Sequence, residues 1–324
     1  MYLLGYAVFW CRLMEKKLSY KAFCNDMLAE VKRELGEAYS TELAKMPQLN
    51  GGFRDGIVIR KNGIKMSPTV VTETYYDLYR SEEMPFDNIV WEIMRIYRNG
   101  GEMTEEAAAR LDCFDCVKGR IVYRLINRTT NSRLLSYIPF FEYLDLAIVF
   151  YIRDETNLSG GILIRNGFLA KWGITQEELL AFAKDNTPRL ESTQIRPLQE
   201  VLKELEAQFG TGEYVVPKDG DVPLYILTNS SGLYGAACIL YEGVIKAFSE
   251  QLDSDLLLLP SSLHEFLLLR HEQRDGESKR LGGLVEYVNA TSVQPEDFLS
   301  NSVYVYRRQS DRIELVTDNH GLLS

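Results

Sequence analysis

The sequence predicts an α+β protein in which antiparallel β-hairpins are covered by helices. Its most distinctive stretch runs from residue 255 to residue 269, where two apolar runs flank Pro260, Ser261 and Ser262. Short apolar runs that end at a turn are typical of buried strands, so this stretch is expected to form a tight hairpin. A helix over residues 263–270 is the alternative, because spacing alone does not separate the two structures.

A repeated order of elements supports the same fold class. The order helix, strand, strand, helix fits residues 117–186 and fits residues 236–289 again. An aspartate precedes the first strand in both places, Asp145 in one and Asp255 in the other. Aspartate commonly caps turns, so both are expected to hold the turn that leads into the strand. The N-terminal third follows the same order more loosely.

The N-terminal third is expected to hold a capped helix followed by a hairpin. Residues 20–35 place apolar side chains at helical spacing, with Ser19 as the N-cap and Gly36 as the stop. Residues 56–66 predict a hairpin, because Asn62-Gly63 suits a turn that needs two positive φ angles. Two further helices are expected at residues 75–79 and 89–97.

The rest of the chain alternates between helices and short strands. Thr175 and Glu178 form a capping box, and the helix that it opens is expected to end near Pro188. Other helices are expected at residues 104–111, 117–126, 198–209, 236–252, 284–288 and 295–299. Strands are expected at residues 145–152, 162–164, 224–227, 303–307 and 312–316.

These elements divide the chain into four segments. They are an apolar N-terminal extension at 1–18, an N-terminal α+β region at 19–101, a middle helix-strand-strand-helix unit at 102–209 and a C-terminal α+β unit at 210–324. Asn99-Gly100-Gly101 marks the first internal boundary. The extension lacks the basic start and the cleavage site of a signal peptide. It is also shorter than the roughly 20 residues that span a bilayer, so we expect no membrane-spanning segment there. We expect it to dock on the core as an extra helix or strand, with an interfacial membrane anchor as the alternative.

Composition excludes several classes of function. The net charge is −10 and the pI is about 5.1, with no basic stripe that would neutralise phosphates, so nucleic-acid binding is not expected. The five cysteines are odd in number and scattered, which favours a reducing compartment and predicts a cytoplasmic protein. The sequence defines no oligomeric state.

Motifs for metals and cofactors are incomplete or absent. Cys113 and Cys116 form one C-x-x-C pair, but a zinc site of this type needs a second pair or histidines nearby. A G-x-G-x-x-G turn, a Walker loop and an H-E-x-x-H helix are all missing from the sequence. We therefore predict that the protein uses no cofactor and no metal.

Candidate catalytic residues cluster at the central hairpin. Ser262 and His264 lie on the same face of a strand and are a candidate nucleophile and base, with Asp145 or Glu265 as the carboxylate. The alternative is a structural Pro-Ser-Ser turn and a histidine bonded to the backbone, which is favoured because no G-x-S-x-G elbow surrounds either serine. Further candidates are Asn127, Asn131 and Asn229, although asparagine commonly serves in turns and caps.

Several motifs together resemble an uncharacterised bacterial family, domain of unknown function 5688. They are Lys61-Asn-Gly63, Ser67-Pro-Thr69, Tyr123-Arg-Leu-Ile-Asn127, Asn131 with Leu134-Leu135, Leu144-Asp-Leu-Ala-Ile-Val-Phe150, Leu227-Thr-Asn229, Leu259-Pro-Ser-Ser-Leu-His-Glu265, Val288-Asn289 and Leu299-Ser with Val303-Tyr304. The resemblance implies one shared fold from about Ser19 to the C-terminus. It brings no activity, cofactor or catalytic residue.

Two functions from different classes are consistent with these observations. The first is a non-catalytic intracellular protein that binds a protein or peptide partner, which requires an exposed apolar patch or groove. The second is a hydrolase that uses Ser262 and His264 with a carboxylate from elsewhere in the chain. Scarce histidine and the lack of an assembled catalytic set favour the first.

Overall fold

The computed structural model describes residues 17–47, 49–61, 69–97, 105–154, 161–209, 223–271 and 277–316. The fold is α+β, as the sequence predicts, with three antiparallel sheets in the described residues. The Asn62-Gly63 turn, the boundary at residues 99–101 and residues 1–16 of the predicted extension lie outside the described ranges. None of the helices described is long and apolar enough to cross a bilayer.

The chain forms two compact units. The first comprises residues 1–48 and 52–111, and the second comprises residues 49–51 and 112–324. The predicted middle segment from residue 112 onward and the predicted C-terminal segment therefore lie together in one unit. The second unit also takes Leu49–Gly51 from the middle of the first.

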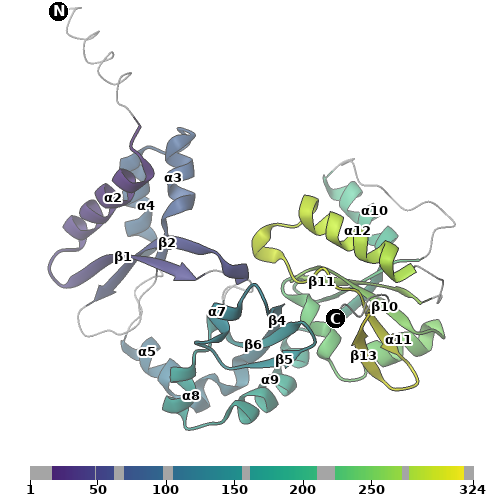
Figure 1. Ribbon diagram of the computed structural model, residues 1–324. Helices are drawn as coiled ribbons and strands as arrows, with labels where there is room; N and C mark the ends of the chain where they lie inside the picture. The colour runs from purple at the N-terminus through teal and green to yellow at the C-terminus, as the bar shows by residue number, and fades with distance from the viewer. Residues whose placement is uncertain are drawn as a thin grey trace, which may run out of the picture. The chain divides into compact units, whose positions relative to one another are not determined.

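The first unit packs helices on a three-stranded sheet. Its elements are α2 (Tyr20–Leu35), β1 (Tyr39–Pro47), β2 (Phe53–Lys61), β3 (Thr69–Val71), α3 (Thr72–Arg80), α4 (Phe86–Ile96) and most of α5 (Glu105–Asp112). In Figure 1, α2, α3 and α4 gather beside the sheet of order β1-β2-β3. The core joins Phe23, Met27, Ile57, Ile59 and Ile93.

The predicted helix of the first unit is confirmed together with its caps. The Ser19 hydroxyl accepts the N–H of Ala22, and Gly36 ends α2 with a φ of 72°. A positive φ there suits glycine. The strand β1 is not among the predicted elements, and it supplies the main partner of β2.

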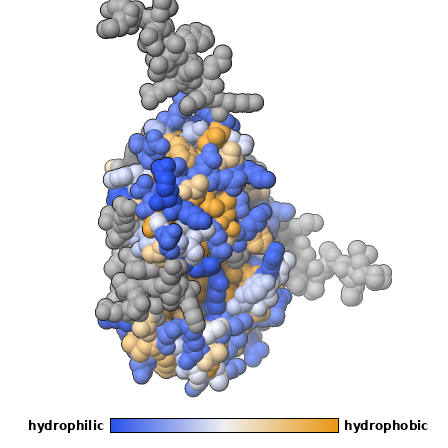
Figure 2. Space-filling model, turned by 90° about the vertical axis from the view of Figure 1, so that its left-hand side faces the viewer, coloured by the Kyte–Doolittle hydropathy of each residue, from blue (hydrophilic) through white to orange (hydrophobic). Residues whose placement is uncertain are grey.

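Three large apolar side chains are exposed in the described part of this unit. Figure 2 shows hydrophobic residues in orange interspersed with hydrophilic residues in blue on the face that it presents. Leu43, Phe53 and Trp91 are 38%, 42% and 65% exposed, and they lie on β1, β2 and α4. Single exposed apolar residues are ordinary on a protein surface, so they mark no site by themselves.

The second unit contains two sheets. The four-stranded sheet has the order β4-β6-β5 with β7 also on β6, and the six-stranded sheet has the order β13-β12-β10-β11-β9-β8. Their strands are β4 (Ile121–Asn127), β5 (Phe140–Tyr143), β6 (Leu146–Arg153), β7 (Gly161–Leu163), β8 (Thr193–Pro197), β9 (Tyr225–Asn229), β10 (Leu256–Ser262), β11 (Glu265–Arg270), β12 (Tyr304–Arg307) and β13 (Arg312–Leu315). The predicted hairpin is β10–β11, so the helical alternative for residues 263–270 is wrong.

Helices cover these sheets. They are α6 (Phe114–Val117), α7 (Ser132–Leu135), α8 (Asn166–Trp172), α9 (Gln176–Leu190), α10 (Leu198–Phe209), α11 (Val244–Leu252) and α12 (Glu277–Ser292), with 3-10 turns η1 (Leu49–Gly51), η3 (Lys118–Arg120), η4 (Gly235–Leu240) and η5 (Pro295–Asp297). Leu281 and Val285 of α12 pack on Leu257 and Leu259 of β10. The turn η4 contacts both sheets, touching β4 of one and β9 and β11 of the other.

The helix predicted over residues 117–126 is wrong. Residues 121–127 form the strand β4 instead, in which every residue is buried and none alternates with solvent. The predicted helix–strand–strand–helix order therefore does not hold at residues 117–186. The helix α9 also runs past Pro188 to Leu190, which places Glu191 immediately after its end.

Candidate functional site

Ser262 and His264 flank the turn between β10 and β11, and each is bonded to the backbone. The Ser262 hydroxyl accepts the N–H of His264 at 3.0 Å. The Nδ1 of His264 accepts the N–H of Tyr234 at 3.0 Å, and its Nε2 lies 3.2 Å from Oδ1 of Asp297. Because Nδ1 accepts a hydrogen bond from the backbone N–H of Tyr234, a neutral ring carries its own proton on Nε2, toward Asp297. The imidazole thus bridges two loops, and the nucleophile–base pair stays a prediction.

Asp145 lies at the turn before β6 and binds three hydroxyl groups. Its carboxylate accepts hydrogen bonds from Ser300 and Tyr304 at 2.6 Å each and from Ser302 at 3.0 Å. Burial, followed by the neighbouring carboxylate, raises the pKa of the Tyr304 phenol. Within the described residues Asp145 contacts neither Ser262 nor His264, so the three predicted catalytic residues are not brought together. Glu265 instead accepts the hydroxyl of Ser261.

Asn127 and Asn131 meet at a junction with Asn50. The Asn131 side chain accepts the N–H of Asn50 at 2.7 Å and donates to its Oδ1 at 3.0 Å. The Asn50 amide donates in turn to the carbonyls of Pro295 and Phe298, at 2.8 Å each. Asn127 donates to the carbonyl of Leu299 at 2.9 Å. These contacts hold loops together, which is the structural role that the sequence favours for asparagine.

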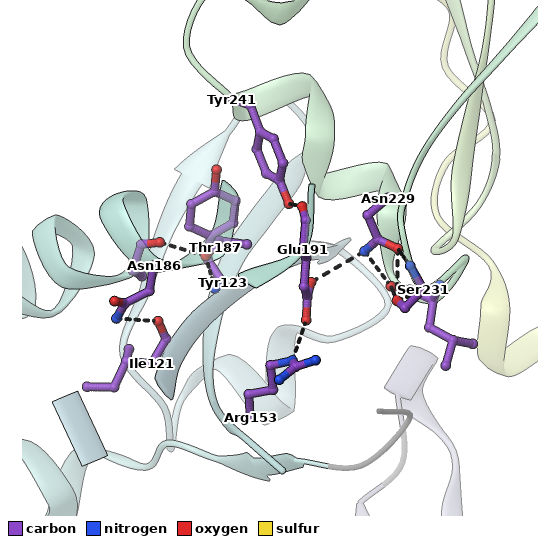
Figure 3. Close-up of polar contacts among 11 residues, drawn as sticks. Ile121, Tyr123, Arg153, Asn186, Thr187, Glu191, Asn229, Ser231 and Tyr241 are labelled. Carbon is purple, nitrogen blue, oxygen red and sulfur yellow. Dashed lines mark hydrogen bonds and ion pairs between the residues drawn. The ribbon is translucent and has the colours of Figure 1, made fainter. Parts of the chain in front are cut away.

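The third predicted asparagine belongs to a buried polar cluster around Glu191 (Figure 3). Glu191 is 6% exposed, and its carboxylate accepts from the Asn229 amide at 3.3 Å and pairs with Arg153 at 3.5 Å. The Tyr241 hydroxyl donates to its backbone carbonyl at 3.0 Å. Burial raises the pKa of Glu191, and the charges of Arg124 and Arg153 oppose that rise only in part. A carboxyl group in this setting holds its proton more readily than an exposed one.

Arg124 is held between two aromatic rings beside this cluster. Its guanidinium carbon lies 4.2 Å from the ring centre of Tyr151 and 3.6 Å from that of Tyr234. A cation stacked on desolvated rings gains about 2 kcal/mol. Tyr234 has a φ of 56°, which is uncommon for a bulky residue, and the His264 contact holds its backbone there. The loop that carries Tyr234 is thus fixed by His264 on one side and by Arg124 on the other.

An open cleft lies next to this cluster, between β5 and α9 on one side and η4, α11 and β13 on the other. It has a volume of about 440 Å³, within the range of roughly 300–1,000 Å³ that is usual for ligand sites. We call it the aromatic cleft, because its lining includes Tyr123, Phe141, Tyr143, Tyr241 and Tyr306 together with aliphatic residues such as Leu180 and Ile313. A more polar groove of about 630 Å³ shares Lys246 and Tyr306 with it.

Most charged groups at the aromatic cleft already have partners. Glu142 pairs with Arg128, and Asp311 accepts the Tyr306 hydroxyl at 2.6 Å and lies 3.6 Å from Lys246. Lys184 of α9 is exposed and has no ion-pair or hydrogen-bond partner in the described part of the chain. The cleft therefore presents one uncompensated positive charge beside apolar walls.

Sequence reasoning missed both the Glu191 cluster and the aromatic cleft. Glu191 directly follows α9, Arg124 lies on β4 and Arg153 lies on β6, and no local pattern marks any of them as buried. The described residues contain no group of three or more His, Cys, Asp or Glu side chains that could hold a metal ion. The pair Cys113 and Cys116 flanks the start of α6 and is not disulfide-bonded.

The family model for the family of unknown function DUF5688 matches residues 20–308. The chain belongs to this family. The match begins at the first residue of α2 and includes β4, β10 and α12, so it spans both compact units. No curated protein and no solved structure matches the chain.

Proposed function

We propose that this DUF5688 member is a cytoplasmic protein that binds an extended apolar segment of a partner protein in the aromatic cleft, without catalysis. The observation that carries the proposal is the cleft itself, whose aromatic and aliphatic walls stay open to solvent. Burial of such walls favours binding by about 25 cal/mol for each Å² removed from water.

The edge strand β5 favours a peptide over a compact ligand. Three consecutive residues of β5, Phe141, Glu142 and Tyr143, line the cleft. Neighbours on a strand alternate between faces, so a run of three indicates that the edge of the strand lies along the cleft. In the described residues β5 has β6 as its only strand partner. An extended peptide can add to such an edge through its backbone and place alternate side chains in adjacent pockets.

The hydrolase hypothesis has less support. A hydrolase needs the Ser262 hydroxyl within hydrogen-bond reach of a free imidazole nitrogen. Both groups already bind backbone amides, and Asp145 binds Ser300, Ser302 and Tyr304 instead. If the protein hydrolyses model esters and Ser262→Ala abolishes that activity without lowering the Tm, hydrolysis replaces binding as the better proposal.

The binding proposal is tested by selecting a library of random twelve-residue peptides on the full chain. Leu180→Arg places a charge on one wall of the cleft, and Leu284→Arg is the matched control, because Leu284 is 52% exposed on α12 and does not line the cleft. We expect the recovered peptides to bind Leu180→Arg at least about tenfold more weakly, which corresponds to about 1.4 kcal/mol. They should bind Leu284→Arg as they bind the wild type. Peptides that bind all three proteins equally would refute the proposal.

A further inference from the structure

We infer that the segment bound in the aromatic cleft carries a carboxylate that pairs with Lys184, while Tyr123 and Tyr143 donate to other acceptors of the same segment. The inference rests on the proposed function and specifies the chemistry of the partner: an apolar peptide segment with an acidic residue. Three polar groups that line the cleft support it, and they lie on α9, β4 and β5.

The two phenols are unused donors. Tyr123 is 2% exposed and Tyr143 is half-buried, and both line the cleft. Neither hydroxyl has a hydrogen-bond partner among the described residues. Burial raises the pKa of Tyr143 to about 12 and raises that of Tyr123 as well. Both phenols therefore keep their protons at neutral pH and can donate to an acceptor.

Two alternative occupants fit the lining less well. A cationic segment would meet Lys184 without a free acid to receive it, because Glu142 and Asp311 are already paired. A wholly apolar segment could accept hydrogen bonds from the phenols through its backbone carbonyls, but it would bring no anionic partner to the Lys184 ammonium, and covering a charge without a partner is unfavourable. A carboxylate on an extended segment satisfies the ammonium, and the backbone carbonyls of the same segment can accept hydrogen bonds from the phenols.

The contrast with the Glu191 cluster supports this assignment. The Tyr241 hydroxyl also lies at the cleft, but it already donates to the carbonyl of Glu191, and the Tyr306 hydroxyl already donates to Asp311. Four tyrosines line the cleft. The hydroxyls of Tyr241 and Tyr306 thus donate within the protein, and the hydroxyls of Tyr123 and Tyr143 can donate to a ligand. The latter two belong to β4 and β5, on the side of Lys184.

The test uses the library peptides that depend on Leu180, resynthesised with each Asp or Glu replaced by Asn or Gln. Fluorescence anisotropy with labelled peptides measures the Kd for the wild type, for Lys184→Met and for Lys203→Met. Lys203 is the control because it is an exposed lysine on α10 outside the cleft. We expect one acid-to-amide change to weaken wild-type binding about tenfold to a hundredfold, as expected for a charged hydrogen bond.

Replacing the acidic residue of the peptide by its amide should have little effect on the Kd for Lys184→Met. In Lys184→Met the acid and amide peptides should bind within about twofold of each other, because the coupling disappears when either partner is removed. Lys203→Met should keep the wild-type preference. Peptides that need Leu180 but bind equally well as acid and amide would overturn the carboxylate inference and leave the proposed function standing. Failure to recover any peptide that depends on Leu180 would overturn both.

Discussion

Replacement of Gly235 by alanine should destabilise the second unit strongly. Gly235 begins η4, the turn that contacts both sheets of this unit. A Cβ atom built there would lie 2.6 Å from the backbone nitrogen of Asn229 and 2.6 Å from the carbonyl oxygen of His264, and closer still to the Thr228 hydroxyl. Two of these neighbours are backbone atoms, so a side-chain rotation does not relieve the overlap.

The size of the effect follows from two contributions. Overpacking in a well-packed interior typically costs about 1–3 kcal/mol. The added methyl group also displaces Thr228, whose hydroxyl donates to the His264 carbonyl at 2.8 Å, and loss of that bond costs roughly 0.5–1.5 kcal/mol. The sum is about 1.5–4.5 kcal/mol, which lowers the Tm of a unit of this size by roughly 3–18 °C.

The assay is thermal unfolding followed by far-UV circular dichroism, with Gly167→Ala as the matched control. Gly167 lies in α8, and a Cβ there would meet no atom within 4 Å. Alanine in a helix is favoured over glycine by about 0.5–1 kcal/mol, so the control should be neutral or slightly stabilised. If Gly235→Ala melts within about 2 °C of the wild type, the reasoning from close backbone approach is refuted.

Three further predictions concern the second unit. Asn50→Gly, chosen because Asn50 has a φ of 62°, should lower the free energy of unfolding by about 1–3 kcal/mol through lost hydrogen bonds, and a change below about 0.5 kcal/mol in urea unfolding would contradict this. Because the pKa of Glu191 is raised in the folded state, its contribution to stability falls as pH rises through the range between the unfolded and folded pKa values. The free energy of unfolding of the wild type, relative to that of Glu191→Gln, should therefore be larger at about pH 5 than at about pH 7 when both are measured by urea unfolding. A difference that is the same at both pH values would argue against a raised pKa. Burial raises the pKa of Cys238 to about 11, so iodoacetamide should label it at least about a hundredfold more slowly in the native protein than in urea, and equal rates measured by peptide mass mapping would rule this out.

The elements that sequence reasoning predicted well carry their signals locally. The Ser19 cap, the Gly36 stop and the capping box of Thr175 with Glu178 each involve residues within one helical turn. Such contacts form without help from the rest of the fold. The sequence therefore suffices to place both ends of α2 and the start of α9.

The strands β1 and β4 depend on distant partners instead. Residues 121–127 become a strand because β6 pairs along their whole length, from Ile121 opposite Ile152 to Asn127 opposite Leu146. With every residue buried, the strand lacks the alternation that distinguishes it from a helix. The polar strand β1 likewise forms because β2 pairs with it over nine positions.

Whether Pro260 ends its strand depends on the position of that strand in the sheet. The sequence suggests that the first strand of the central hairpin stops there, yet β10 continues to Ser262. Its partner β12 pairs only with Leu256–Leu258, so one edge of β10 is open at Pro260. Proline lacks an N–H, and an open edge does not require one. Which edge is open depends on strand order, and the local sequence does not contain that information.

The candidate site was harder to predict than the fold for the same reason. Ser262 and His264 are conspicuous in the sequence because only one residue separates them. In the structure, the Ser262 hydroxyl bonds to the nearby backbone and the His264 ring bonds to another loop. Tyr123, Tyr143 and Lys184 are 20 or more residues apart in the sequence, and they line one cleft only after β4, β5 and α9 have assembled.

The insertion of Leu49–Gly51 into the second unit affects how the protein can be divided. The chain passes from one unit to the other at three places, since residues 49–51 leave the first unit and return to it before the final crossing after Leu111. A fragment of residues 112–324 would lack Asn50, and the carbonyls of Pro295, Glu296 and Phe298 would lose its amide. A fragment of residues 1–111 would carry that missing piece. The second unit is therefore complete only when both fragments are present, and we expect the fragment of residues 1–111 to bind the fragment of residues 112–324 through Leu49–Gly51.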